Sequence, residues 1–175
     1  VGSSDGITVD STPPSTPVVT DEGHYTVQTD RLRATWQSSD LQSGIAKYEI
    51  SIGSAPGLDD IAGWLNAGTV TDYTVAGLSL QPGNTYFINV RAVNNAGLVS
   101  AVGSSDGILV ESTPPVTPVV NDEGVFTTST TSLSATWYSE DPETGVVKYE
   151  YSIGTAPGLT NVVLWTDTGL NTGIN

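Results

Sequence analysis

Tyr86-Phe-Ile-Asn-Val-Arg-Ala92 alternates apolar and polar residues, so every second side chain falls on the same face of an extended chain. Arg31-Leu-Arg-Ala-Thr-Trp36 and Ala46-Lys-Tyr-Glu-Ile-Ser-Ile52 show the same period of two. The inward sets are Leu32, Ala34 and Trp36; Ala46, Tyr48, Ile50 and Ile52; and Tyr86, Ile88, Val90 and Ala92. The outward residues are Arg31, Arg33, Lys47, Glu49, Asn89 and Arg91. One apolar and one polar face per strand predicts an all-β fold of packed antiparallel sheets.

The chain contains an internal duplication with an offset of 101 residues. Residues 1–74 align with residues 102–175 without a gap, and 41 of the 74 pairs are identical. Trp36 returns as Trp137, and Trp64 returns as Trp165. The two copies are therefore expected to share one fold, and the chain is interpreted as a stretch of a tandem array.

Two Thr-Pro-Pro segments, at residues 12–14 and 113–115, are expected to mark boundaries between units, because consecutive prolines favour an extended linker. Residues 1–11 are therefore predicted to be the last strand of a preceding repeat. Residues 12–112 are predicted to form a complete domain, and residues 113–175 the N-terminal part of a further one. Such a partial domain would be completed by a continuing chain or by another molecule that supplies the missing strands.

The chain of 175 residues carries 19 acidic residues against 5 basic ones, a net charge of −14 at pH 7. Nucleic acids and anionic membranes are bound through Lys and Arg, so neither partner is expected. No stretch approaches the ~20 apolar residues of a membrane-spanning helix, and no membrane insertion is expected. With no Cys and one His, the chain offers little for a thiolate metal site or a catalytic triad, so no enzyme activity is expected.

Four features resemble a known family. Leu80-Gln-Pro-Gly-Asn-Thr-Tyr86 resembles the tyrosine corner of fibronectin type III domains, and Val90-Arg-Ala-Val-Asn-Asn-Ala-Gly97 resembles their sixth strand and following loop. Trp36 and Tyr48 stand where that family places its core aromatic residues. The resemblance implies tandem seven-stranded Greek-key β-sandwiches, close to the immunoglobulin layout. The core residues implied are Trp36, Tyr48, Leu80 and Tyr86, with Trp137 and Tyr149 in the second copy.

Ser43-Gly-Ile-Ala-Lys-Tyr-Glu49 and Ile52-Gly-Ser-Ala-Pro-Gly57 resemble bacterial-type modules of large secreted or surface-attached repeat proteins. This resemblance implies an extracellular or cell-surface location, with neighbouring repeats or identical chains in a fibre as partners. The expected function is a non-catalytic structural segment of a fibre, stalk or adhesin. Two alternatives stay open: a filament subunit assembled by strand complementation between chains, and a glycan-binding or spacer module of a secreted enzyme or receptor.

Carboxylates flank both linkers, and oxygen ligands of this kind are what Ca²⁺ prefers. The first set is Asp5, Asp10, Asp21 and Glu22, and the second is Asp106, Glu111, Asp122 and Glu123. Calcium bound there would stiffen the joint between units. The alternative is an acidic surface that keeps a repeat protein soluble. No other cofactor is expected.

Trp64 and Trp165 lie outside the alternating segments, and Tyr25 and Phe126 lie near the first loop. Such side chains either cover the edge of a sandwich core or form a stacking platform for glycans, and both interpretations stay open. His24 is replaced by valine in the second copy, so the repeat does not require it, and an exposed loop position is expected.

Overall fold

The three alternating segments of the first copy are strands in the computed structural model, which describes residues 2–175. They are β3 (Arg31–Gln37), β4 (Ile45–Gly53) and β7 (Thr85–Asn94). The chain divides into two units, the first ending at Ser112 and the second comprising Thr113–Asn175, hereafter unit 1 and unit 2. Both units are built from strands and irregular segments, and no helix in residues 2–175 would be long and apolar enough to span a membrane.

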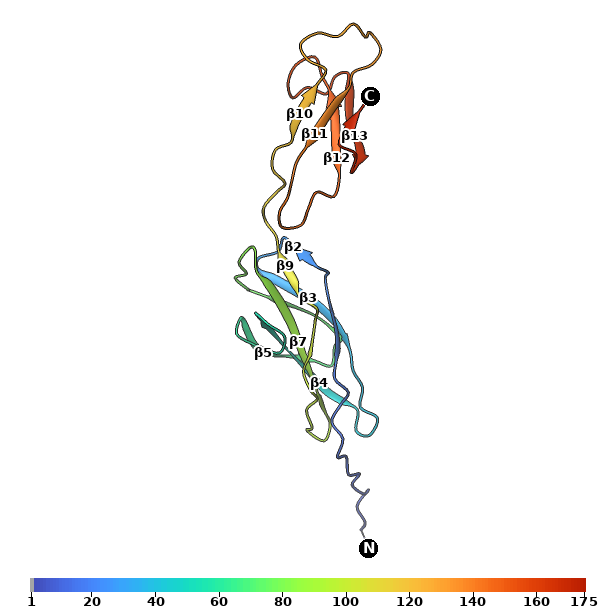
Figure 1. The fold of residues 1–175 in the computed structure, drawn as a ribbon. Helices are drawn as coiled ribbons and strands as arrows, with labels where there is room; N and C mark the ends of the chain where they lie inside the picture. The colour runs from blue at the N-terminus through green and yellow to red at the C-terminus, as the bar shows by residue number, and fades with distance from the viewer. Residues whose placement is uncertain (1) are drawn as a thin grey trace. The chain divides into compact units, whose positions relative to one another are not determined.

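Unit 1 is a sandwich of two sheets, which confirms the predicted all-β fold. The smaller sheet has the order β1-β3-β6, and the larger has the order β2-β9-β7-β4-β5, with β8 pairing alongside β7. Strands β4 and β7 lie side by side in the larger sheet (Figure 1). The remaining strands are β1 (Val18–Asp21), β2 (Tyr25–Thr26), β5 (Ala62–Gly68), β6 (Asp72–Ala76), β8 (Gly103–Ser104) and β9 (Ile108–Val110).

The first and last strands of unit 1 are each interrupted once. Gly23 separates β1 from β2 with φ = 115°, and Gly107 lies between β8 and β9 with φ = 98°. Positive φ of this kind favours glycine, so both breaks are set by the sequence. After the first break the chain leaves the smaller sheet, because β1 pairs with β3 whereas β2 pairs in parallel with β9.

The core of unit 1 lies between the two sheets. Its larger buried side chains are those of Leu32, Trp36, Tyr48, Ile50, Ile52, Val75, Leu80, Tyr86, Ile88, Val90, Ile108 and Val110, each no more than 4 % exposed. The rings of Trp36 and Tyr48 meet edge to face with centroids 5.7 Å apart. Tyr86 forms a tyrosine corner, because its hydroxyl accepts a hydrogen bond from the N–H of Gln81 at 2.9 Å.

Two residues differ from the predicted alternation. The register between β4 and β7 shifts between Ile45 and Lys47, so Ile45 packs against the core in place of Ala46, which is half-buried. The alternation predicts that Asn89 lies on the outward, polar face, but it is fully buried. The cause is the loop that follows β4: Asn89 Nδ2 donates to the carbonyl of Leu58 at 2.6 Å, and its Oδ1 accepts from the N–H of Gly57 at 2.7 Å.

Unit 2 repeats the first part of this layout. Its strands are β10 (Val119–Asp122), β11 (Ala135–Tyr138), β12 (Tyr149–Ile153), β13 (Val163–Gly169) and β14 (Gly173–Ile174), in the sheets β10-β11-β14 and β12-β13. Trp137 is buried, whereas Tyr149 is half-buried. Strands β11 and β12 begin at Ala135 and Tyr149, each three residues after the position that matches the start of β3 or β4.

Residues 2–17, before β1, form no strand, and the assignment of residues 1–11 to the last strand of a preceding repeat stays a prediction; Val1 lies outside the described residues. Ile7 and Val9 are 95 % and 84 % exposed. Their counterparts in the duplication, Ile108 and Val110, are fully buried in β9. The same apolar pattern is thus a strand where a neighbouring strand pairs with it and an extended segment where none does.

Candidate functional site

Five residues from three segments meet where the N-terminal linker reaches unit 1, and this cluster is called the linker anchor: Asp10, Thr12, Asp40, Ser43 and Asn94. The Asn94 Nδ2 atom lies 2.8 Å from Asp10 Oδ2 and 3.1 Å from Asp40 Oδ2. It also lies 3.1 Å from the carbonyl oxygen of Thr12, and the hydroxyl of Ser43 donates to Asp10. One amide therefore bridges two carboxylates that would otherwise repel each other.

The orientation of the Asn94 amide is fixed from its other side. Asn94 is the last residue of β7 and is 1 % exposed. Its Oδ1 accepts hydrogen bonds from the N–H of Ala96 at 3.1 Å and from the N–H of Leu98 at 2.8 Å. A flipped amide would place its own N–H groups against these donors, so Nδ2 has to face the carboxylates.

Asp40 is held by the turn between β3 and β4. Its Oδ1 accepts from the N–H groups of Gln42, Ser43 and Gly44 at 3.1, 2.8 and 3.1 Å. These bonds, that of Ser43 foremost, lower the pKa of Asp40 below its usual value, and the Asn94 amide acts in the same direction. The Asp40 carboxylate therefore stays ionised and can accept a hydrogen bond from the Asn94 amide.

The Asp40→Asn variant is expected to destabilise unit 1 near neutral pH and to have little effect at about pH 2. A carboxyl whose folded pKa is depressed stabilises the fold above its unfolded pKa of about 3.9, and this contribution is lost as the pH falls through the folded value. Urea unfolding of the variant and the parent chain at both pH values measures the difference. An equal loss at the two pH values would contradict this account of Asp40.

A second hydrogen bond joins the linker to the turn between β3 and β4. The N–H of Ser15 donates to the carbonyl of Ser39 at 2.9 Å. The corresponding bond in unit 2 runs from the N–H of Val116 to the carbonyl of Glu140 at 3.0 Å. Both copies therefore fasten the residues that follow Thr-Pro-Pro to the loop after the Trp-bearing strand.

The eight carboxylates predicted as calcium ligands do not converge within either unit. Asp10 lies in the linker anchor, whereas Asp21 accepts from the N–H of Gly23 and Asp122 from the N–H of Gly124. Asp5, Glu22, Asp106 and Glu123 are exposed, and Glu111 is half-buried. Among residues 2–175, no group of three or more His, Cys, Asp or Glu side chains is placed to hold a metal ion.

The linker anchor does not fit a cation either. Asp10 and Asp40 do approach each other, but the space between them is taken by the Asn94 amide, which presents hydrogens and no lone pair. Sequence reasoning included Asp10 and passed over Asp40 and Asn94. The recurrence of Asp40 as Asp141 was the available signal, whereas nothing in the local sequence links Asn94 to a residue 84 positions earlier.

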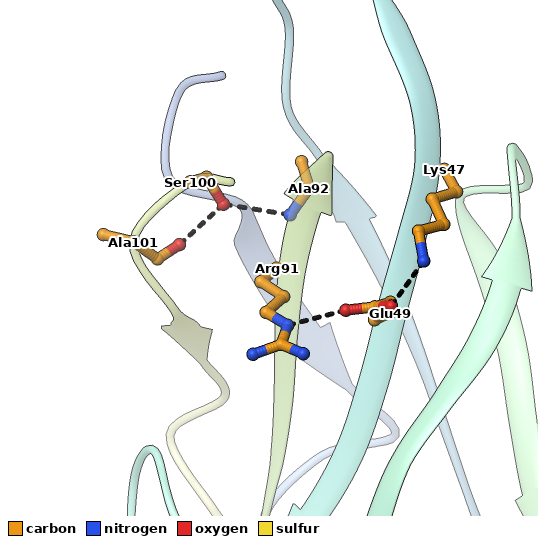
Figure 2. A network of polar contacts seen from close by, with 6 residues as sticks. All are labelled: Lys47, Glu49, Arg91, Ala92, Ser100 and Ala101. Carbon is orange, nitrogen blue, oxygen red and sulfur yellow. Dashed lines mark hydrogen bonds and ion pairs between the residues drawn. The ribbon is translucent and has the colours of Figure 1, made fainter. Parts of the chain in front are cut away.

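The outer face of the larger sheet carries a second polar cluster. Figure 2 shows Glu49 between Lys47 and Arg91, whose nitrogens lie 2.6 and 2.7 Å from its two oxygens. These contacts, the Lys47 hydrogen bond foremost, lower the pKa of Glu49. The Arg91 guanidinium lies over the ring of Trp64, 4.3 Å from its centroid, so one face of that ring is covered. Trp165, the counterpart in unit 2, is 66 % exposed.

Ser100, His24, Tyr25 and Phe126 do not belong to either cluster. Figure 2 also shows Ser100 beside β7. Its hydroxyl accepts a hydrogen bond from the N–H of Ala92 at 2.9 Å and donates one to the carbonyl of Ala101 at 2.7 Å. His24 is exposed, and its Nδ1 lies 3.8 Å from Asp106. Tyr25 and Phe126 are also exposed.

Two packed sheets, an edge-to-face Trp36–Tyr48 pair and a tyrosine corner define unit 1 as a β-sandwich module of the immunoglobulin-like class. The model of the fibronectin type III domain matches residues 8–105, more than half of the chain. The chain therefore belongs to the fibronectin type III family. No curated protein matches it.

Several solved structures are similar to the chain. A titin module from human cardiac muscle is 25 % identical and covers 57 % of this chain and 91 % of its own, with a TM-score of 0.39. The FN1 to FN3 domains of chicken CNTN1 are 26 % identical and cover 72 % of this chain and 42 % of their own, with a TM-score of 0.42. A twitchin kinase region from C. elegans is 21 % identical and covers 57 % and 16 %, with a TM-score of 0.39.

Proposed function

We propose that the chain is a non-catalytic structural segment that spaces and aligns repeated sandwiches in an extended protein outside the cell or on its surface. Fibronectin type III domains are generally non-catalytic modules, and they occur in extracellular proteins and in intracellular ones such as titin. The 41 identities between the two copies support an array of like units. The secreted location rests on the resemblance of residues 43–49 and 52–57 to modules of surface-attached repeat proteins.

The observation that carries this proposal is the linker anchor. A spacer transmits alignment only if the segment that enters a unit is held against it, because a free linker behaves as a flexible joint. Asp10 and Thr12 of the linker bond to Asn94, a buried residue of the larger sheet. These hydrogen bonds support a linker that is held against the unit it enters.

Replacing Asp10 by alanine is expected to loosen residues 10–15 while leaving the core of unit 1 in place. The variant loses the bonds of Asp10 to Asn94, Ser43 and the N–H of Thr12. Backbone order parameters from nitrogen relaxation should fall in the linker from values near about 0.85 toward about 0.6. Asp5→Ala, in an exposed stretch, is the matched control. Unchanged order in the Asp10→Ala linker would contradict its role as an anchor.

The mass and location of the natural polypeptide test the proposed function itself. An antibody raised against this chain would be used on denatured extracts and on separated cell-surface, secreted and intracellular fractions. The proposal expects a polypeptide several times heavier than 18.2 kDa in the surface or secreted fraction. A polypeptide of about this mass, or one confined to the intracellular fraction, would contradict it.

A further inference from the structure

The two linkers combine hydroxyl side chains with prolines and carry no charge. Residues 11–17 read Ser-Thr-Pro-Pro-Ser-Thr-Pro, and residues 112–118 read Ser-Thr-Pro-Pro-Val-Thr-Pro. In a chain of net charge −14, residues 11–20 and 112–121 contain no Asp, Glu, Lys, Arg or His. Segments rich in Ser and Thr together with Pro are typical of stalks that carry O-linked sugars. The sequence pattern alone does not say which hydroxyl would carry one.

The linker of unit 1 is held along one side. The N–H of Ser15 donates to the carbonyl of Ser39 at 2.9 Å, and the hydroxyl of Ser15 accepts from the N–H of Ser39 at 2.9 Å. Pro14 and Pro17 are buried, and a proline favours an extended conformation in the residue before it. Because successive side chains of an extended chain point in opposite directions, Thr16 faces away from the loop that Ser15 contacts.

Thr16 carries the free threonine hydroxyl of this linker. The residue is exposed, and its hydroxyl makes no hydrogen bond within residues 2–175. The Thr12 hydroxyl lies 3.3 Å from Asp10 Oδ1, and the Thr12 N–H donates to the same oxygen at 3.0 Å. Ser11 is also exposed, but it stands between Asp10 and Thr12, which are both part of the linker anchor. Thr16 is therefore the threonine that an enzyme can reach from solvent.

The second linker presents its threonine in the same way. Thr117, the counterpart of Thr16, is exposed, precedes Pro118 and has no hydrogen bond within residues 2–175. The N–H of Val116 donates to the carbonyl of Glu140 at 3.0 Å, so the residue before the threonine is again held by the loop. The two linkers thus share the free threonine and differ in the residue beside it, serine in one and valine in the other.

We propose that Thr16 and Thr117 are acceptors for O-linked sugars. A glycosyltransferase would use a nucleoside-diphosphate sugar. The threonine Oγ1 attacks the anomeric carbon, the bond from this carbon to the diphosphate oxygen breaks, and a glycosidic bond forms. The hydroxyl proton passes to a base on the transferase, and the nucleoside diphosphate leaves. The attached sugars would add polar groups to linkers that have no charge of their own. The inference goes beyond the proposed function and shares with it the location outside the cell.

Mass spectrometry of the natural polypeptide tests the proposal. A protease that cuts after Asp and Glu releases residues 11–21 and 112–122, so each peptide contains one linker. Both peptides are expected to carry the mass of at least one sugar residue. Fragmentation that preserves the glycosidic bond should place it on Thr16 and Thr117. Bare peptides, a phosphate in place of the sugar, or a sugar confined to other hydroxyls of these peptides would overturn the proposal.

Variants made in the native host assign the sites. Thr16→Val and Thr117→Val keep the shape of the side chain and remove the hydroxyl, so each linker peptide should lose its sugar completely. Ser15→Ala is the matched control, because it removes the neighbouring hydroxyl that is bonded to Ser39, and the sugar should remain. A sugar that persists in the valine variants would contradict the assignment.

The same preparation separates this proposal from the proposed function. A heavy polypeptide at the cell surface with bare linkers would refute the sugar sites and leave the spacer function standing. A polypeptide of about 18.2 kDa that carries sugars on both threonines would refute the spacer function and support the sugar sites.

Discussion

Replacing Trp36 by alanine should lower the free energy of unfolding of unit 1 by about 3–5 kcal/mol. The Trp36 side chain is 2 % exposed and meets Tyr48 edge to face, so its removal leaves a large cavity between the sheets. Small domains have only ~5–15 kcal/mol of stability, and a loss of this size leaves unit 1 partly unfolded at moderate temperature.

The measurement has to separate the two units. Urea unfolding followed by circular dichroism gives the size of the change, and hydrogen exchange resolved along the chain shows whether β3, β4 and β7 lose protection. Trp165→Ala is the matched control, because Trp165 is 66 % exposed and its loss should change stability by less than about 0.5 kcal/mol. Equal effects of the two variants would refute the assignment of Trp36 to the core.

Asn94→Ala should destabilise unit 1 by roughly 2–3 kcal/mol, a large effect for a polar residue. The variant removes the acceptor for the N–H groups of Ala96 and Leu98 and the donor that bridges Asp10 and Asp40. The two carboxylates are then left facing each other in a partly buried site, and their repulsion adds to the loss.

Asn95→Ala is the control for this prediction. Asn95 is exposed, and its side chain makes one hydrogen bond, from Nδ2 to the carbonyl of Ser43. Its loss should change stability by about 1 kcal/mol at most. Urea unfolding near neutral pH compares the two variants. If Asn94→Ala were no more destabilising than Asn95→Ala, the amide bridge would contribute little to the fold.

The apolar alternation was sufficient to predict the sandwich, because burial between two sheets imposes a period of two on every paired strand. Leu32, Trp36 and Val90 follow this rule and are at most 2 % exposed. Ala46 and Asn89 depart from it for tertiary reasons. A register shift between β4 and β7 puts Ile45 in the core in place of Ala46, and the loop after β4 covers Asn89. Neither effect can be predicted from the few residues on either side of these positions.

The linker anchor shows a different limit of sequence reasoning. Acidic residues near the linker suggested calcium, and Asp10 does contact the domain, but through an asparagine from the far end of β7. Spacing along the chain cannot reveal such a partner, since the fold brings the two residues together across 84 positions. The sequence shows that Asp10 lies in the linker, and only the tertiary structure shows that Asn94 contacts it.

The Asn94 side chain differs from that of aspartate by one atom, the Nδ2 that faces the carboxylates. Its Nδ2 is surrounded by oxygens of Asp10, Thr12 and Asp40 at 2.8 to 3.1 Å. An aspartate at this position would put an oxygen in place of that nitrogen and bring three carboxylates and a carbonyl together, which is the ligand chemistry that Ca²⁺ selects. Attachment of the linker to unit 1 would then depend on the cation concentration of the surroundings. Asn94→Asp would thus turn a hydrogen-bonded contact into one that responds to a bound cation.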